Sequence, residues 1–250
     1  MIDLRQFNPL RLTLFLAAVF AAMPAGAQIW FDTAAIMQPV VLNPCPGGQC
    51  PGAGADDEAD GDAEQPDRSA PAVTAPPSDA LTYVPSLQRR NTNLADLVAQ
   101  TRRQNPESAS AMERLFAGTD IFAQMAAALA PHGYAIDNLG DAYAFWWMTA
   151  WEGARGSNRA STPDEMQAVQ AQAHRALATA PQVVQADNAT RQQMAESLWI
   201  QAAMIDGMVD LAREQPELMP QLQRSVRQGA RTVGIDLDAM RLTANGFVMQ

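Results

Sequence analysis

The chain has no lysine and few histidines, cysteines or aromatic residues. Arginine supplies all 17 basic residues, and only two histidines and two cysteines occur in 250 residues. Without a lysine amine, Schiff-base catalysis is excluded. His132, His174, Cys45 and Cys50 are too few and too scattered for a typical zinc site, and no serine lies in the GxSxG turn of an α/β-hydrolase. The sequence therefore predicts no metal site, no cofactor and no catalytic residue.

Long apolar runs are also missing. A membrane-spanning helix needs about 20 apolar residues, and the longest run, residues 12–23, falls short of that. This run follows Arg5 and Arg11 and precedes the small residues AGA at 25–27. Basic, apolar and small residues in this order are typical of a secretory signal peptide. We expect cleavage after Ala27 and a mature protein that is periplasmic or secreted, without a membrane span.

The excess of acidic residues lies before the folded domain. Residues 28–80 carry nine Asp or Glu against one Arg, whereas residues 81–250 carry seventeen against fourteen. Residues 43–80 consist mainly of Pro, Gly, Ala and acidic residues, a composition typical of a disordered linker. Nucleic acid and anionic membranes both require a basic face, so neither is expected as a partner.

Two features lie at the N-terminal side of this linker. Residues 28–42 include a short apolar segment, IWFDTAAIMQPVVL at 29–42. A flexible tether of about 36 residues has a root-mean-square span near 33 Å, so this segment could fold back on the domain or reach a partner. Cys45 and Cys50 could form a local disulfide in an oxidising compartment or stay free thiols. A metal or redox role is the weakest alternative for them.

Residues 81–250 show a succession of helix signals. The clearest is Thr162 with Pro163 and Glu165, a capping box with proline in the first turn. Further starts are predicted at Asn93, Asn105, Asp120, Asn138, either Asp187 or Asn188, and Pro220. No segment shows the sustained alternation of a strand. We predict an all-α fold in which one compact domain, residues 81–250, contains about seven helices.

The helix that starts at Asn138 carries most of the aromatic residues, in DAYAFWWMTAW at 141–151. A helix that is apolar around most of its circumference is usually a buried central one, so we predict that the domain is built around it. An alternative is that Tyr143, Trp147 and Trp151 line a groove for an apolar or sugar-like ligand. Trp199 falls among carboxylates on another helix, where it could bind a ligand or partner protein, or cover a neighbouring helix.

Three stretches carry a resemblance to a known family. They are LTYVPS with RRN (residues 81–86 and 89–91), DNLGDAYAFWWMTAW (137–151) and LTANGF (242–247). Together they resemble an uncharacterised family of secreted bacterial helical proteins, a domain of unknown function. The resemblance implies an extracytoplasmic helical domain and assigns no catalytic residue.

We therefore expect a non-catalytic extracytoplasmic binding module whose partner is an envelope protein or a small apolar or sugar-like ligand. The alternative is a hydrolase that acts on envelope material with Asp141, Glu152 or Glu196 as acid or base. Asp141 and Glu152 are about 16 Å apart along one helix, too far to act as a glycosidase pair with each other. An enzyme should instead bring at least two of the three carboxylates together with shifted pKa values.

Overall fold

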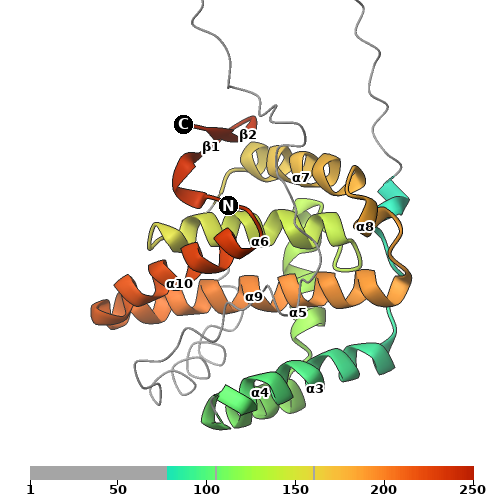
Figure 1. The fold of residues 1–250 in the computed structure, drawn as a ribbon, viewed down its shortest axis with the longest axis vertical. Helices are drawn as coiled ribbons and strands as arrows, with labels where there is room; N and C mark the ends of the chain where they lie inside the picture. The colour runs from blue at the N-terminus through green and yellow to red at the C-terminus, as the bar shows by residue number, and fades with distance from the viewer. Residues whose placement is uncertain (1–77, 105, 160) are drawn as a thin grey trace, which may run out of the picture.

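The computed structural model describes residues 78–104, 106–159 and 161–250, and our expectations for residues 1–77, including Cys45 and Cys50, lie outside this part. The described part is all-α apart from one small hairpin, which confirms the predicted class (Figure 1). Its helices are α3 (Leu87–Gln104), α4 (Pro106–Gly118), α5 (Ile121–Leu129), α6 (Leu139–Ala154), α7 (Pro163–Ala178), α8 (Pro181–Val184), α9 (Asn188–Glu214) and α10 (Met219–Thr232). Short 3₁₀ turns at Ser78–Leu81, Ala130–His132, Pro216–Leu218 and Leu237–Ala239 connect them.

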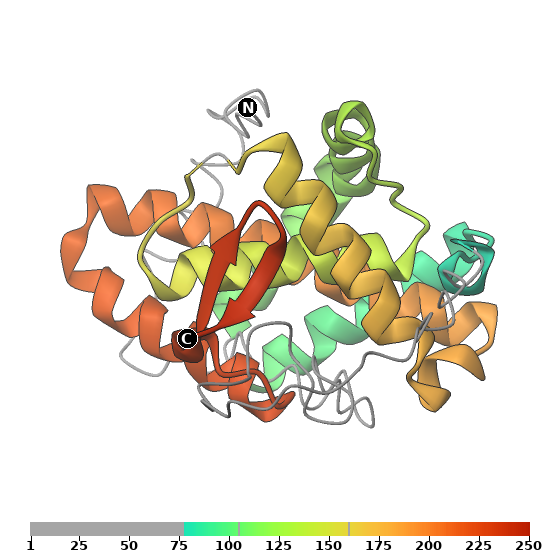
Figure 2. The same cartoon turned by 90° about the horizontal axis from the view of Figure 1, so that it is seen from above.

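Helix α6 is the centre of the domain, as predicted. Every residue in it except Trp151 is buried. It lies between α7 and α9, and α10 and the C-terminal hairpin close the remaining side (Figures 1 and 2). Helix α9 runs beside α6 in the same direction, because Phe145 packs on Trp199 and Gly153 approaches Ile205 further along. A helix enclosed on all sides needs apolar residues around its whole circumference, which its sequence supplies.

Most helix ends follow from local sequence. The Thr162 hydroxyl accepts a hydrogen bond from the Glu165 N–H, and the Glu165 carboxylate accepts one from the Thr162 N–H. The caps at Asp120, Asn138 and Asp187 are also present. Helix α10 ends with Gly234 at φ 81° and the Ile235 N–H bonded to the Ala230 carbonyl, 2.9 Å away. These ends need no tertiary contact, so the sequence predicts them.

Helix α3 begins six residues before the predicted start at Asn93. Ser86 caps it, because the Ser86 hydroxyl accepts a hydrogen bond from the Arg89 N–H at 3.3 Å. Asn93 instead lies inside α3 and donates to the Glu196 carboxylate of α9 at 2.7 Å. Asn93 therefore links α3 to α9 and does not cap a helix.

The C-terminal hairpin was missed from the sequence. Strands β1 (Met240–Thr243) and β2 (Gly246–Met249) are antiparallel, with Leu242 opposite Phe247. Gly246 follows the short loop with φ 94°. The Gln172 side chain of α7 both accepts from the Phe247 N–H and donates to its carbonyl. Four-residue strands are too short for alternation to be visible, and the Asn245–Gly246 pair was the only local hairpin signal.

The close approach of α6 to α9 and α10 depends on Gly153. A Cβ atom at this position would lie 2.6 Å from the Ile205 side chain and 3.6 Å from that of Val226. We predict that Gly153→Ala lowers the free energy of unfolding by about 1–3 kcal/mol, because the added methyl overpacks the core. Urea unfolding measures the change. Gly118→Ala is the control, since a Cβ there meets nothing within 4 Å, and equal unfolding midpoints for the two variants would contradict the prediction.

Candidate functional site

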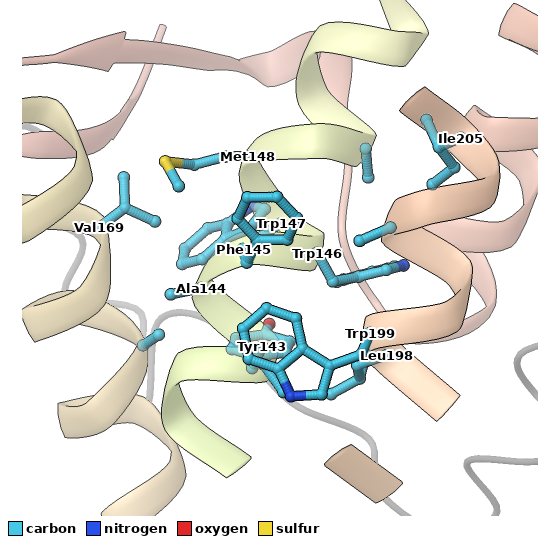
Figure 3. Packing of buried hydrophobic residues seen from close by; sticks show 14 of the residues in the cluster. Tyr143, Ala144, Phe145, Trp146, Trp147, Met148, Val169, Leu198, Trp199 and Ile205 are labelled. Carbon is cyan, nitrogen blue, oxygen red and sulfur yellow. The ribbon is translucent and has the colours of Figure 1, made fainter. Parts of the chain in front are cut away.

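The aromatic side chains of α6 form the interior of the domain. Tyr143 and Trp147 are fully buried, and their ring centroids lie 5.7 Å apart. The Trp147 ring packs on Phe247 of the hairpin, with centroids 4.6 Å apart. Figure 3 shows Tyr143 and Trp147 between Val169 of α7 and Leu198 of α9. The predicted core is confirmed, and a surface ligand does not reach these two rings in this conformation.

The hydroxyl of Tyr143 and the indole nitrogens of Trp146 and Trp147 are buried donors that find no acceptor among the described residues. Burial also raises the pKa of the Tyr143 hydroxyl above its usual value. An unpaired buried donor costs stability. These three donors therefore lower the stability of the fold, and the apolar packing of α6 has to offset that loss.

Trp151 is the partly exposed member of the group, and it supports the C-terminal hairpin. Its indole N–H donates to the Met240 carbonyl at 3.0 Å. The Arg155 guanidinium lies 4.1 Å from the ring centre and donates to the carbonyls of Leu237 and Met240 at 3.2 and 2.9 Å. The Arg155 guanidinium thus stacks on one face of the Trp151 ring, and the indole N–H is satisfied by the hairpin.

Trp199 is fully buried, so the hypothesis of an exposed indole on α9 is wrong. Its N–H donates to the Ile136 carbonyl at 3.1 Å, and its ring packs on Phe145 of α6. The alternative, that this indole covers a neighbouring helix, is confirmed. The carboxylates beside Trp199 on the helical wheel indicated a solvated face, but α3 and the segment before α6 cover that face.

The three candidate acid or base residues lie in separate networks. Asp141, at the start of α6, accepts from the Ala135 N–H and the Gln170 amide, both at 2.7 Å, and lies 2.6 Å from Nε2 of His174. His174 packs close because residue 140 is glycine, and a Cβ there would lie 2.6 Å from His174 Nε2. This carboxylate fastens α7 to the start of α6.

Glu196 performs the same task on the other side of the domain. Glu196 is only 1% exposed. Its carboxylate accepts hydrogen bonds from Arg90 at 2.8 Å, Asn93 at 2.7 Å and Gln192 at 2.9 Å. The Arg90 guanidinium also lies 4.3 Å from the Phe122 ring centre. A buried carboxylate is tolerated only when it is paired and hydrogen-bonded in this way. Glu196 therefore holds α3 on α9.

Glu152, near the end of α6, is the one predicted carboxylate with a strongly raised pKa. It accepts from the Ser161 hydroxyl at 3.2 Å, and Arg159 lies 3.9 Å away. Burial raises its pKa to about 7, and the negative charges of Asp206 and Glu165 add to the rise, while Arg159 and Ser161 act against it.

Asp206 of α9 is a second acidic group of this kind, and the sequence analysis did not select it. Burial raises its pKa to about 7, and Asp210 adds to the rise, while Asn158 and Arg213 oppose it. The Asn158 amide donates to Asp210 at 2.8 Å. Part of the Asp206 residue reaches solvent, although its carboxyl is crowded by protein. Two acidic groups on neighbouring helices thus have pKa values raised towards neutral pH.

These two carboxyls define the candidate site: Glu152, beside Arg159 and Ser161, and Asp206, beside Asn158. Asp141 and Glu196 do not belong to it. Glu152 and Asp206 are far apart in sequence, and only the packing of α6 on α9 brings their charges together. No local motif could have identified the pair.

Comparison with models of protein families places the chain in one family. A model of a family of unknown function, DUF6683, matches residues 51–250. The chain belongs to this family. The match covers the whole described domain and begins within the acidic segment that precedes it. No curated protein and no solved structure matches the chain.

Two further observations concern the described residues alone. No three His, Cys, Asp or Glu side chains among them are grouped so that they could hold a metal ion. None of their helices has the length and apolar character needed to cross a bilayer.

We predict that the domain loses stability as pH rises from about 5 to about 8. A carboxyl with a raised pKa in the folded state keeps its proton there, while the same group in the unfolded chain has already ionised, so rising pH favours unfolding. The combined loss should be about 1–3 kcal/mol, because the partial exposure of Asp206 reduces its share. Urea unfolding at several pH values measures it. Glu152→Gln should flatten the profile, Glu214→Gln at the exposed end of α9 should not, and a stability that rises over this range would contradict the assignment.

A pair of tyrosines tests whether the Tyr143 hydroxyl has a partner. Tyr134 donates to the Met166 carbonyl at 3.1 Å, whereas Tyr143 has no acceptor among the described residues. We predict that Tyr134→Phe lowers the free energy of unfolding by about 1 kcal/mol and that Tyr143→Phe leaves it unchanged or raises it. Thermal and urea unfolding of both variants measure these changes in the free energy of unfolding. A larger loss at Tyr143 would indicate that its hydroxyl binds something the described residues do not provide.

Proposed function

We propose that the chain is a non-catalytic extracytoplasmic interaction domain that binds an apolar protein segment. The signal-peptide pattern at 1–27 supports the location. The separation of Asp141, Glu152 and Glu196 into three networks supports a non-catalytic role, because a hydrolase of the expected type would bring two of them together. Asp141 and Glu196 are occupied by internal donors that hold helices in place.

The observation that carries the proposal is an apolar patch of three exposed side chains: Val84, Leu87 and Val184. They are 72%, 70% and 46% exposed. All three surround the first turn of α9. The Val84 N–H is bonded to the Asn188 side chain, and Ser86, next to Leu87, exchanges two hydrogen bonds with the side chain of Gln192.

Val184 joins the patch through Arg191. This guanidinium donates to the carbonyls of both Thr82 and Val184, each at 3.3 Å. The two chain segments that carry the exposed valines are therefore held on either side of one arginine. Figures 1 and 2 show α8, the entering segment and the first turn of α9 together at one end of the domain. Exposed apolar clusters of this kind mark interaction sites more often than isolated apolar residues do.

The charges beside the patch indicate the partner's chemistry. Helix α3, which begins in the patch, carries Arg89 in its first turn, whereas Arg90 is bonded to Glu196 and Arg102 and Arg103 lie in the last turn. Asp187 caps α9 beside the patch, and its carboxylate accepts a hydrogen bond from the Thr190 N–H. We therefore propose a partner segment that is apolar and has acidic residues next to it.

A second function is favoured by one observation, the pair of carboxyls with pKa values near 7. Groups with such values are suited to general acid–base chemistry, so a hydrolase could use Glu152 and Asp206. Incubation of the protein with purified envelope polymers at pH 5 to 8 tests this. Released fragments that disappear in Glu152→Gln would favour the hydrolase, and the interaction domain predicts no release.

The patch makes a direct prediction for cross-linking. A photoreactive p-benzoylphenylalanine in place of Leu87 should cross-link to an apolar segment with acidic neighbours, as mapped by mass spectrometry. The same substitution at Met249, which is 37% exposed at the other end of the domain, is the control. Adding Val84→Asp should abolish the product from position 87. Equal products from positions 87 and 249, or none from position 87, would contradict the proposed surface.

A further inference from the structure

We propose that the chain's own residues 29–42 occupy the apolar patch. This inference rests on the interaction surface proposed above and names its occupant. In the free protein the patch would then be covered from within, and an external partner would have to displace this segment.

The first argument is where the chain enters the described domain. The turn Ser78–Leu81 leads directly into Thr82 and Val84. Thr82 is fixed at this point by a bridge to Asn138 and by the Arg191 guanidinium, which also holds Val184. The described domain therefore begins beside the patch.

The second argument is the length of the connection. Residues 43–77 separate the apolar segment from Ser78, and a flexible chain of this length has a root-mean-square span of about 33 Å. A tether with this span is long enough for residues 29–42 to reach the patch. The local concentration of the segment at the patch is then of millimolar order, so even a weak contact is occupied.

The third argument is chemical complementarity. Residues 29–42 contain Ile29, Trp30, Phe31, Ile36 and Met37, and then Val40, Val41 and Leu42. These are side chains of the kind that gain most from covering exposed valine and leucine. The tether adds seven Asp or Glu between residues 56 and 67 against one Arg at 68. The segment thus has the apolar character that the patch favours, and the acidic residues lie in the tether that follows it.

Trp30 provides a specific test, because it is the only one of the five tryptophans outside the described domain. Trp146, Trp147 and Trp199 are buried, and Trp151 is covered by Arg155. The experiment uses the protein as the producing cell makes it, with its N-terminus determined by mass spectrometry. Iodide quenching of the protein and of its Trp30→Phe variant gives the accessibility of Trp30 by difference. We expect Trp30 to be protected.

Substitutions in the patch should release the segment. The double variant Val84→Asp with Leu87→Asp should raise the iodide quenching of Trp30 several-fold, towards that of a free indole. Met249→Asp, an exposed apolar residue away from the patch, should leave it unchanged. Ile36→Asp in the segment should raise it as the patch variant does, and because Ile36 lies outside the described domain, this result does not depend on how the double variant folds.

Three outcomes would overturn the inference. Trp30 could be fully accessible before any substitution, Met249→Asp could release it as well as the patch variant does, or its protection could depend on protein concentration. The last result would mean that a second copy covers it. The cross-link from position 87 separates the two proposals: a product within one chain at 29–42 supports both, a product on another protein supports only the surface, and no product removes both.

Discussion

The structure depends on the enclosure of one helix. Because α6 is buried around its circumference, α7, α9, α10 and the hairpin each have to contribute an apolar face to it. Gly153 sets the distance to α9, and Phe247 closes the end over Trp147. Most of the aromatic residues are thus used as packing.

Buried carboxylates fix the outer helices on this centre. Asp141 holds α7 through His174 and Gln170, and Glu196 holds α3 through Arg90 and Asn93. Removing one partner of such a buried network leaves an uncompensated charge and costs more than the network itself contributes. Burial of acidic residues is often a sign of catalysis, but here these two carboxylates are satisfied by groups that belong to other helices. Glu152 and Asp206 differ, because their surroundings favour a proton over an ion pair.

The sequence predicted what local chemistry determines. The capping box at Thr162, the cap at Asp187 and the end of α10 at Gly234 involve neighbours within a few residues, and all three are present. The central position of α6 was predictable because its apolar character is visible in its own residues. Trp199 was not predictable in the same way, because its burial depends on α3 and residues 134–138, which are distant in sequence. The same holds for Asp206, whose pKa is raised mainly by burial, which depends on segments distant in sequence.

Helix α9 connects the apolar patch to the candidate site at Glu152 and Asp206. With 27 residues it is about 40 Å long, and it begins in the apolar patch. Asp206 lies about 27 Å further along the same rod, with the Glu196 tie between them. Between these two points Phe145 packs on Trp199 and Gly153 approaches Ile205, so α6 holds α9 over most of this distance. A displacement imposed at the first turn would therefore have to move α6 as well before it could reach Asp206.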